Sequence, residues 1–193
     1  MLEMSSLPQP QTAVAIDFLR AISPNRWDLA AILPEGGRPE FRTFMPSDSA
    51  AAGKWIEARQ GSAGLYYQVN EVRDGFVNRK ATKADIARVL HLHADIDVND
   101  EETLRRIQLV VPTPTVIVFS GGGFQPLWTL HEPSTEFDRV ERINMALARI
   151  LGGDNCHNVD RLLRLPGTIN MPNAKKRAAG RWPTLARIIS NEI

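Results

Sequence analysis

The sequence predicts an α/β or α+β protein in which a mixed β-sheet packs against helices. Two kinds of segment alternate along the chain: stretches with apolar residues at helical spacing, such as 12–22, and short β-branched runs, such as 115–119. A glycine-rich turn between two apolar runs indicates at least one hairpin. With 193 residues, of which 43% are hydrophobic, the chain is long enough for one domain with a real core.

Residues 1–11 are expected to be a flexible terminus, and residues 12–193 are expected to form a single domain. Helical spacing of apolar residues and N-capping side chains predict helices over 12–22, 47–60 and 82–89. The last of these opens with Thr82 and Asp85 at the spacing of a capping box. Apolar runs between turn signals predict strands over 27–33, 41–45 and 65–70.

The second half of the chain opens with an alternating strand over 91–98. Asp100 and Ser134 are expected to cap two amphipathic helices, over 101–110 and 135–151. Between these helices, the strands 115–119 and 124–130 flank a glycine loop and are expected to pair as a hairpin. Shorter extended segments are predicted over 159–165 and 184–189.

Composition and charge restrict the class of protein. Cys156 is the only cysteine, which excludes an intramolecular disulfide and a cysteine-based zinc site and predicts a cytoplasmic location. No apolar run approaches the roughly 20 residues of a membrane span, and no signal peptide is recognisable, so no membrane partner is expected. The net charge is only +1, but the sole acid after Asp160 is Glu192. A basic group that can attract phosphates therefore lies near the C-terminus: Lys175, Lys176, Arg177, Arg181 and Arg187.

The stretch 91–98 carries two acids on one face of a predicted strand. Side chains alternate between the faces of a strand, so Leu92, Ala94, Ile96 and Val98 form an apolar face, and the opposite face carries His91, His93, Asp95 and Asp97. Two neighbouring carboxylates repel each other unless a cation lies between them. A divalent metal site at Asp95 and Asp97 is the first hypothesis.

Two further segments carry polar groups that suit phosphate. In the loop Ser120-Gly121-Gly122-Gly123, glycines allow backbone amides to approach an anion closely, and Ser120 adds a hydroxyl donor. The loop is neither a Walker A motif nor a Rossmann fingerprint, because no Gly-Lys-Ser/Thr follows it and it leads into a strand. In the segment 158–170, Asp160 is a third carboxylate, and Arg161 and Arg164 can face phosphate.

Taken in order, these three segments resemble the archaeo-eukaryotic primase superfamily, and most closely its RepB-like branch of plasmid and phage replication primases. The superfamily has three motifs in order: two aspartates that alternate with hydrophobic residues, a small-residue Ser-x-His motif, and a hydrophobic segment that ends in a third acid. Asp95 and Asp97 match the first, Ser120 with its glycines matches the second, and Asp160 matches the third. Residues 163–170, Leu-Arg-Leu-Pro-Gly-Thr-Ile-Asn, resemble the Arg-x-Pro-Gly-Thr-x-Asn signature of the branch. The resemblance covers roughly residues 64–190.

The resemblance implies a primase-like catalytic core with an RRM-like half, which makes primers on a single-stranded DNA template from NTP or dNTP substrates. It implies that Asp95, Asp97 and Asp160 hold Mg²⁺ or Mn²⁺ for two-metal nucleotidyl transfer. The nucleotide-binding residues would be Ser120, Gly121, Gly122, Gly123, Gln125, Arg161, Arg164 and Lys175. Asn70, Arg73, His93 and Asn170 are candidates for contacting the template or supporting the site. A helicase or a C-terminal helical domain is a further partner that the superfamily suggests.

One departure from the family pattern concerns Gln125. The family motif has histidine after the small residues, whereas this chain has Phe124-Gln125-Pro126. A glutamine amide can donate a hydrogen bond but carries no charge. Gln125 therefore either substitutes as a phosphate ligand or leaves triphosphate binding weaker.

Two alternative functions remain open from the sequence. His91-Leu92-His93 is the His-hydrophobe-His element of rolling-circle nucleases and relaxases, which use a tyrosine nucleophile, here Tyr66 or Tyr67. That hypothesis leaves Asp97, the glycine loop and Asp160 without a role. A replication module that binds nucleic acid without catalysis is the second alternative, and Gln125 motivates it.

Overall fold

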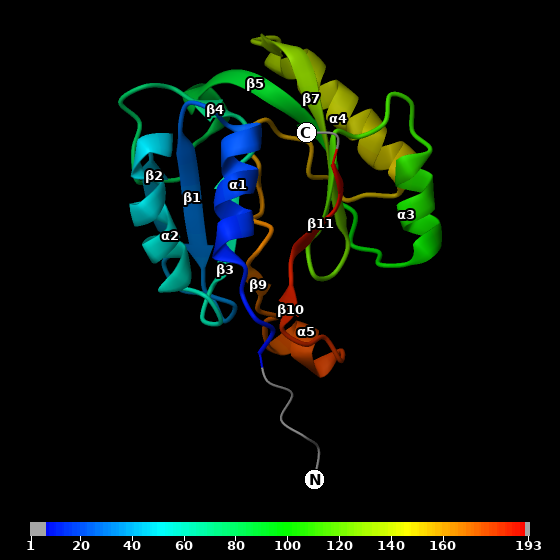
Figure 1. Cartoon of the computed structure of the whole chain (residues 1–193). Coiled ribbons are helices and arrows are strands. Elements are labelled where there is room, and N and C mark those ends of the chain that lie inside the picture. The colour runs from blue at the N-terminus through cyan, green and yellow to red at the C-terminus, as the bar shows by residue number, and fades with distance from the viewer. Residues whose placement is uncertain (1–6, 192–193) are drawn as a thin grey trace.

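The computed structural model describes residues 7–191, which form two lobes with a small C-terminal hairpin below them (Figure 1). The first lobe contains a four-stranded sheet in the order β2-β1-β3-β8, and the second a five-stranded sheet in the order β11-β6-β7-β5-β4. The α+β class is confirmed. Every strand pairing within the described residues is antiparallel, so the expected mixture of parallel and antiparallel strands is not found.

The first lobe packs two helices against its sheet. Its elements are α1 (Thr12–Ile22), β1 (Trp27–Ile32), β2 (Glu40–Phe44), the 3₁₀ turn η1 (Pro46–Asp48), α2 (Ser49–Glu57), β3 (Gly64–Gln68) and β8 (Leu162–Arg164). Apolar side chains of α1, α2, β1, β3 and β8 form one buried cluster, and it extends to Val116, Val118 and Leu127 of the second sheet. The two lobes therefore share a hydrophobic core.

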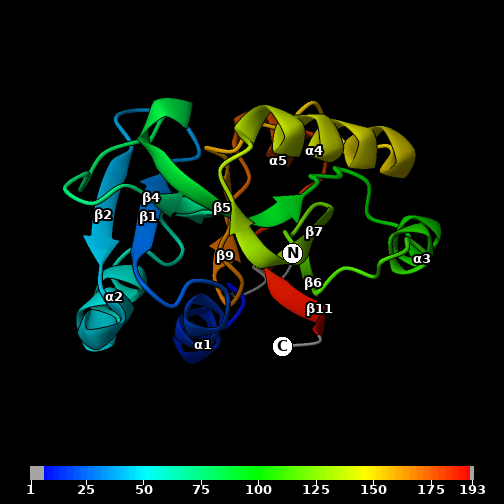
Figure 2. The same ribbon diagram turned by 90° about the horizontal axis from the view of Figure 1, so that it is seen from above.

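The second lobe has the β-α-β-β-α-β order of elements of the expected RRM-like half, although its last strand lies beside the second strand of this unit rather than the first. Its elements are β4 (Glu71–Val72), the 3₁₀ turn η2 (Lys83–Asp85), β5 (Ile86–His93), α3 (Glu101–Gln108), β6 (Val116–Phe119), β7 (Phe124–Ser134), α4 (Phe137–Leu151) and β11 (Arg187–Asn191). The order β5-α3-β6-β7-α4 places β7 between β6 and β5, with both helices to one side of the sheet (Figure 2). Ile107 of α3 and Leu151 of α4 pack on Ile117 and Phe119 of this sheet.

The C-terminal hairpin consists of β9 (Ile169–Asn170), α5 (Ala174–Ala178) and β10 (Thr184–Leu185). The expected strand 184–189 is in fact two strands, β10 and β11, which separate at Ala186. That residue exchanges backbone hydrogen bonds with Gly167 and Thr168, at 2.7 and 2.8 Å. Of the expected flexible terminus, residues 1–6 lie outside the described part, and the Gln11 N–H donates to the Gly167 carbonyl at 2.9 Å.

The expected helix over 82–89 is wrong. The capping box itself forms, since the Thr82 backbone N–H and hydroxyl both donate to Asp85 Oδ2, at 2.9 and 2.6 Å. Only the single turn η2 follows it, because the fully buried Ile86 and Val89 pack in a core cluster as part of β5. Tertiary packing overrides local propensity here.

Other element boundaries differ by a few residues. The expected helix over 47–60 is η1 followed by α2, and the helix expected from residue 135 begins at Phe137, because β7 extends to Ser134. The segment 159–165 is a strand only at 162–164, and the short helix α5 was not predicted. Within the described residues, no helix has the length and apolar character needed to cross a membrane.

Candidate active site

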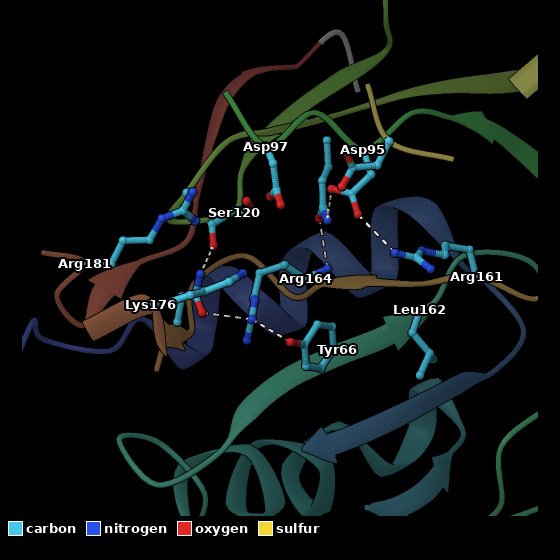
Figure 3. A pocket seen from close by; sticks show the side chains of 13 residues that line it. Tyr66, Asp95, Asp97, Ser120, Arg161, Leu162, Arg164, Lys176 and Arg181 are labelled. Carbon is cyan, nitrogen blue, oxygen red and sulfur yellow. Dashed lines mark hydrogen bonds and ion pairs between the residues drawn. The ribbon is translucent and has the colours of Figure 1, made fainter. Parts of the chain in front are cut away.

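The two lobes meet at a pocket of about 220 Å³ (Figure 3). Three carboxylates line it: Asp95, Asp97 and Asp154. Four cationic side chains line it as well: Arg161, Arg164, Lys176 and Arg181. In Figure 3, Asp95 and Asp97 project from the upper wall, and Arg164 and Lys176 face them from below. The pocket thus places carboxylates, which suit a cation, opposite arginine and lysine side chains, which suit phosphate.

The acidic wall is the chain segment that directly follows β5. The expected strand over 91–98 ends at His93. Beyond it, the Ala94 N–H donates to the Pro126 carbonyl at 3.3 Å, and Ile96 exchanges backbone hydrogen bonds with Phe124 at 2.8 and 2.9 Å. Gly123 allows this contact, because a Cβ at that position would collide with the Ile96 carbonyl oxygen. The glycine loop therefore holds the Asp95–Asp97 segment in place.

Asp95 is tied to both lobes. Gln125 Nε2 donates to Asp95 Oδ1 at 3.0 Å, and Arg161 Nη2 lies 3.3 Å from Oδ2. The other end of the Gln125 amide accepts the backbone N–H of Arg164 at 2.9 Å. Gln125 lines the pocket, but both ends of its amide are engaged, so it acts mainly as a bridge between Asp95 and β8.

Asp154 is the third carboxylate of the pocket, and it is not among the residues predicted from the sequence. Its backbone N–H donates to the Asp95 carbonyl at 2.8 Å. A Cβ on the preceding Gly153 would lie only 2.7 Å from the same carbonyl oxygen, so glycine is needed for this approach. The carboxylates of Asp97 and Asp154 make no hydrogen bond or ion pair with other side chains of residues 7–191. Both are therefore free to bind a cation.

The structure does not bring Asp160 into this pocket. Asp160 lines a neighbouring hollow, together with Lys80 and Asn158. Its carboxylate accepts a hydrogen bond from Asn158 Nδ2 at 2.7 Å. Asp160 therefore does not line the pocket with Asp95 and Asp97, as the family resemblance implied.

Arg164 is the most buried cation of the basic wall, with 7% of its surface exposed. Its guanidinium carbon lies 4.1 Å from the centre of the Tyr66 ring, and Nη2 donates to the Tyr66 hydroxyl and to Asn170 Oδ1, at 2.7 and 2.9 Å. Gly64 makes room for it, since a Cβ there would lie 2.5 Å from Nη1. Burial lowers the pKa of Arg164, but an arginine remains charged in proteins. No carboxylate of the described residues pairs with it.

The glycine loop is held by its own hydrogen bonds. The backbone N–H and the hydroxyl of Ser120 both donate to the Gly123 carbonyl, at 2.8 and 3.1 Å. Asn170 Nδ2 donates to the Ser120 carbonyl at 2.8 Å, which joins β9 to the loop. Ser120 and Gly122 line the pocket, and Gly121 turns the chain with a φ of 92°. The Ser120 hydroxyl is thus directed into the loop.

The basic wall is completed by two residues of the C-terminal hairpin. Lys176, rather than the expected Lys175, lines the pocket, because α5 directs only one of the two neighbouring lysines toward it. The guanidinium of Arg181 lies directly against Gly122, where a side chain would displace it. Both cations approach the glycine loop from the hairpin.

Comparison with known proteins decides the family. Residues 43–192 match the sequence profile of the RepB DNA-primase N-terminal domain. This chain belongs to that family. The predicted resemblance to the RepB-like primase branch is confirmed. No curated protein sequence matches the chain.

Solved structures agree with this RepB-type primase domain in fold. The AEP domain of the cyanophage S-2L primase-polymerase has a TM-score of 0.66 and 17% identity, over 95% of this chain and 91% of that one. Primase RepB' has a TM-score of 0.67 and 15% identity, over 94% of this chain and 57% of that one. The catalytic domain of RepB' in complex with initiator DNA has a TM-score of 0.66 and 15% identity, over 94% and 86%.

His91 and His93 of the RepB-type domain are structural. His91 Nε2 bonds the Ile22 carbonyl at 2.8 Å, and Nδ1 bonds the Thr129 hydroxyl at 3.1 Å. His93 bonds the Cys156 carbonyl and the Asn144 amide, at 3.1 and 3.3 Å. Burial lowers the pKa of both rings, that of His93 to about 4, so both are neutral at pH 7.

The relaxase alternative therefore loses its metal ligands. It also loses Tyr67 as a nucleophile, because that side chain is buried and burial raises the pKa of its hydroxyl. Tyr66 does line the pocket, with its hydroxyl bonded to Arg164. In the part of the chain that the structure describes, no histidine belongs to a group of side chains that could hold a metal.

Asn70 and Arg73 lie away from the pocket. The buried Asn70 accepts backbone N–H groups of Leu90 and His91 at 2.9 and 3.2 Å, and donates to the Val159 carbonyl at 3.0 Å. It therefore ties β5 to the segment before β8. Arg73 donates to the Ile86 carbonyl at 3.3 Å and is otherwise exposed. Of the four candidates for template or supporting contacts, only Asn170 lines the pocket.

The donor set fits a hard divalent cation. The described residues contain no group of three or more His, Cys, Asp or Glu side chains close enough to hold a metal by themselves. Asp95, Asp97 and Asp154 nevertheless present oxygen atoms to one pocket. Mg²⁺ usually binds through one or two carboxylates and completes its coordination with waters and substrate phosphates. Such partial coordination matches this wall.

Small signals in the sequence pointed to the residues that were missed. Gly152 alone terminates α4, with a φ of 71°, so the second glycine, Gly153, indicates a close approach and marks Asp154. Gly64 similarly marks the contact between Tyr66 and Arg164. The choice of Lys176 over Lys175 depends on the rotation of a five-residue helix, which no pattern in the sequence determines.

Proposed function

We propose that residues 12–193 act as the catalytic domain of a replication primase, which transfers nucleotides to a growing primer on single-stranded DNA in the cytoplasm. One observation carries the proposal. Three carboxylates and four cations line a single pocket between the lobes. This arrangement suits a triphosphate whose charge is neutralised from both sides, which is the main requirement of phosphoryl transfer.

The acidic wall would hold Mg²⁺ or Mn²⁺. Asp97 and Asp154 offer free carboxylates, and Asp95 offers one that is already oriented by Gln125. One or two such ions held there would supply a lower pKa for the primer 3′-hydroxyl and positive charge for the leaving pyrophosphate. We assign Asp154 to the position first expected for Asp160, because only Asp154 lines the pocket with the other two.

The basic wall would hold the triphosphate of an NTP or dNTP. Arg164 is fixed by Tyr66 and Asn170, so it presents an orientated positive charge with little loss of side-chain entropy. Lys176 and Arg181 add two charges from the hairpin, and the Ser120–Gly123 loop borders the same space. Arg161 pairs with Asp95 and lies within reach of the phosphate side, so it can exchange one partner for the other.

The direct test is primer synthesis on single-stranded DNA with Mg²⁺ or Mn²⁺. Asp97→Asn and Asp154→Asn are expected to lower the rate by at least about 100-fold, since each removes a charged metal ligand but no volume. Asp160→Asn is the matched control, because its carboxylate faces the neighbouring hollow, and it should keep the rate within a few-fold.

Three results would contradict the proposal in different ways. Wild-type protein that binds DNA but makes no primer would be a binding module without catalysis. DNA that is nicked and covalently joined to a tyrosine of the protein would support the relaxase hypothesis instead. If Asp160→Asn abolishes synthesis and Asp154→Asn does not, the third ligand is Asp160. We further propose that a helicase or a C-terminal helical domain delivers the template.

A further inference from the structure

The hairpin beside the pocket carries a tryptophan that the protein does not bury. Trp182 is 74% exposed, whereas Trp27, Trp55 and Trp128 are at most 9% exposed. The indole N–H groups of these three donate to Ser23, Glu40 and Pro112, at 2.9, 3.0 and 2.8 Å. Within residues 7–191, the Trp182 indole has no such acceptor. Its ring is therefore available to a ligand.

The surroundings of Trp182 are basic. Between Arg161 and Asn191 the chain has no acidic residue and seven lysines and arginines. Among residues 7–191, two of the seven pair with an acid, Arg161 with Asp95 and Arg177 with Glu35. Trp182 directly follows Arg181 of the pocket, and the Arg181 N–H donates to the carbonyl of Lys176, a second cation of the pocket, at 3.0 Å.

The helix α5 beside Trp182 has no buried residue, so it contributes charge to the surface rather than packing to the core. A planar ring among unpaired cations is the arrangement that binds single-stranded nucleic acid, in which bases stack on the ring and cations contact the phosphates. In a duplex the bases stack on one another and their faces are not accessible. A second copy of this face would bring like charges together, which disfavours a dimer here.

We propose that Trp182 stacks on a base of the unpaired template strand where this strand leaves the pocket, while Lys175 and the neighbouring cations contact its phosphates. The assignment rests on the proposed function, because it takes the strand at the pocket to be a primase template. It adds a place outside the pocket where the template is held independently of the metal.

The fluorescence of Trp182 reports directly on this contact. Since the other three tryptophans are buried, acrylamide should quench mainly Trp182 in the free protein. Adding an oligo-dT single strand of about 12 nucleotides, within the usual site size of such proteins, should quench the emission and protect the remainder from acrylamide. A duplex of equal length should do neither. The experiment is run without divalent metal and also with Asp97→Asn, so failed catalysis does not affect it.

The variant Trp182→Ala should weaken single-strand binding by about 5- to 150-fold, the loss expected for one stacked base. Trp182→Phe should retain most of the affinity, because phenylalanine still offers a ring face. Leu109→Ala, which truncates a 70% exposed side chain at the end of α3, is the matched control and should leave binding unchanged.

Three results would overturn the proposal. The first is an affinity unchanged by Trp182→Ala, together with acrylamide quenching that DNA does not alter. The second is equal binding of duplex and single strand. The third is a change in oligomeric state on Trp182→Ala with DNA affinity intact, which would assign the face to a second copy of the chain.

Discussion

Gln125 connects the acidic and basic walls of the pocket through the two ends of its amide. It fixes Asp95 through Nε2 and β8 through Oε1, at 3.0 and 2.9 Å. Its exposed fraction is 6%, so both bonds lie in a poorly solvated environment, where they are stronger than in water. The side chain therefore acts on Asp95 more than on the nucleotide.

The first prediction concerns Gln125→Met, which keeps the length of the side chain but loses both hydrogen bonds. We expect kcat for primer extension to fall about 10- to 100-fold, the usual loss when a residue that orients a metal ligand is removed. The dissociation constant of a fluorescent nucleotide should change by less than about 3-fold, because the basic wall is intact. An equal loss in nucleotide binding would instead make Gln125 a phosphate ligand.

The second prediction concerns His91 and the effect of pH on stability. Burial lowers the pKa of His91 in the folded protein, so the unfolded chain binds more protons below the ordinary histidine pKa of about 6.5. The free energy of unfolding should therefore fall as the pH decreases from 6.5. Urea denaturation between pH 7 and pH 5 measures this slope.

The matched variant for this slope is His91→Gln. It should be less stable at pH 7, since it loses bonds to Ile22 or Thr129, but its stability should depend less steeply on pH. The dependence should not vanish, because His93 is buried as well. Identical slopes for wild type and variant would mean that His91 does not titrate differently in the folded state.

At the scale of elements, the glycine loop and the Asp95–Asp97 segment form one unit. Gly123→Ala should destabilise the protein by at least about 2 kcal/mol, because its Cβ would displace the Ile96 carbonyl and break a paired segment of backbone. Primer synthesis should fall with it, since Asp95 and Asp97 lie on either side of Ile96.

The control for this change is Gly53→Ala, in the middle of α2. A Cβ there meets only a methyl group of Thr12, at 3.8 Å, which is ordinary contact. Alanine favours the helix over glycine by about 0.5–1 kcal/mol, so this variant should be slightly more stable. Thermal or urea denaturation compares the two, and similar stabilities would mean that the loop can move away from Ile96.

The elements themselves were largely predictable, and the exceptions have physical causes. Amphipathic helices such as α1 and α4 follow directly from their periodicity, because each buries one side in a core. The strand β6 follows from its β-branched run, because all four of its residues are buried. The start of β5 was mistaken for a helix, because its capping box is local whereas its partners, β4 and β7, lie far along the chain. The helix α5 could not be predicted from apolar periodicity, because none of its residues is buried.

The site was predictable to the extent that it follows a strand or a motif. Asp95 and Asp97 could be identified because they continue an alternating segment, and Arg164 because it lies in a signature. Asp154 was missed, since its place depends on a loop of the second lobe that folds back onto the Asp95 backbone, and Gly153 is the one signal of this approach in the sequence. Contacts between distant loops are not encoded in local spacing.

At the scale of the whole molecule, several polar bonds of the pocket join parts of the fold that are distant in the sequence. Arg161 with Asp95, Gln125 with the Arg164 backbone, and Asn170 with Ser120 each join parts of the chain that are more than 35 residues apart. The hydrophobic core between the sheets holds the lobes together, and this polar layer sets their spacing at the pocket. Ligand binding at the pocket should therefore stabilise the whole fold.

The last prediction tests this coupling by thermal denaturation. A triphosphate at about 100 times its dissociation constant, with Mg²⁺, should stabilise the protein by about 2.7 kcal/mol. A chelator should remove most of this gain, because without the metal the triphosphate faces three carboxylates. Asp97→Asn should lose the metal-dependent part of the gain, and Asp160→Asn should retain it. If the triphosphate stabilises the wild type equally with and without metal, the acidic wall does not take part in binding the nucleotide, and the basic wall alone accounts for its affinity.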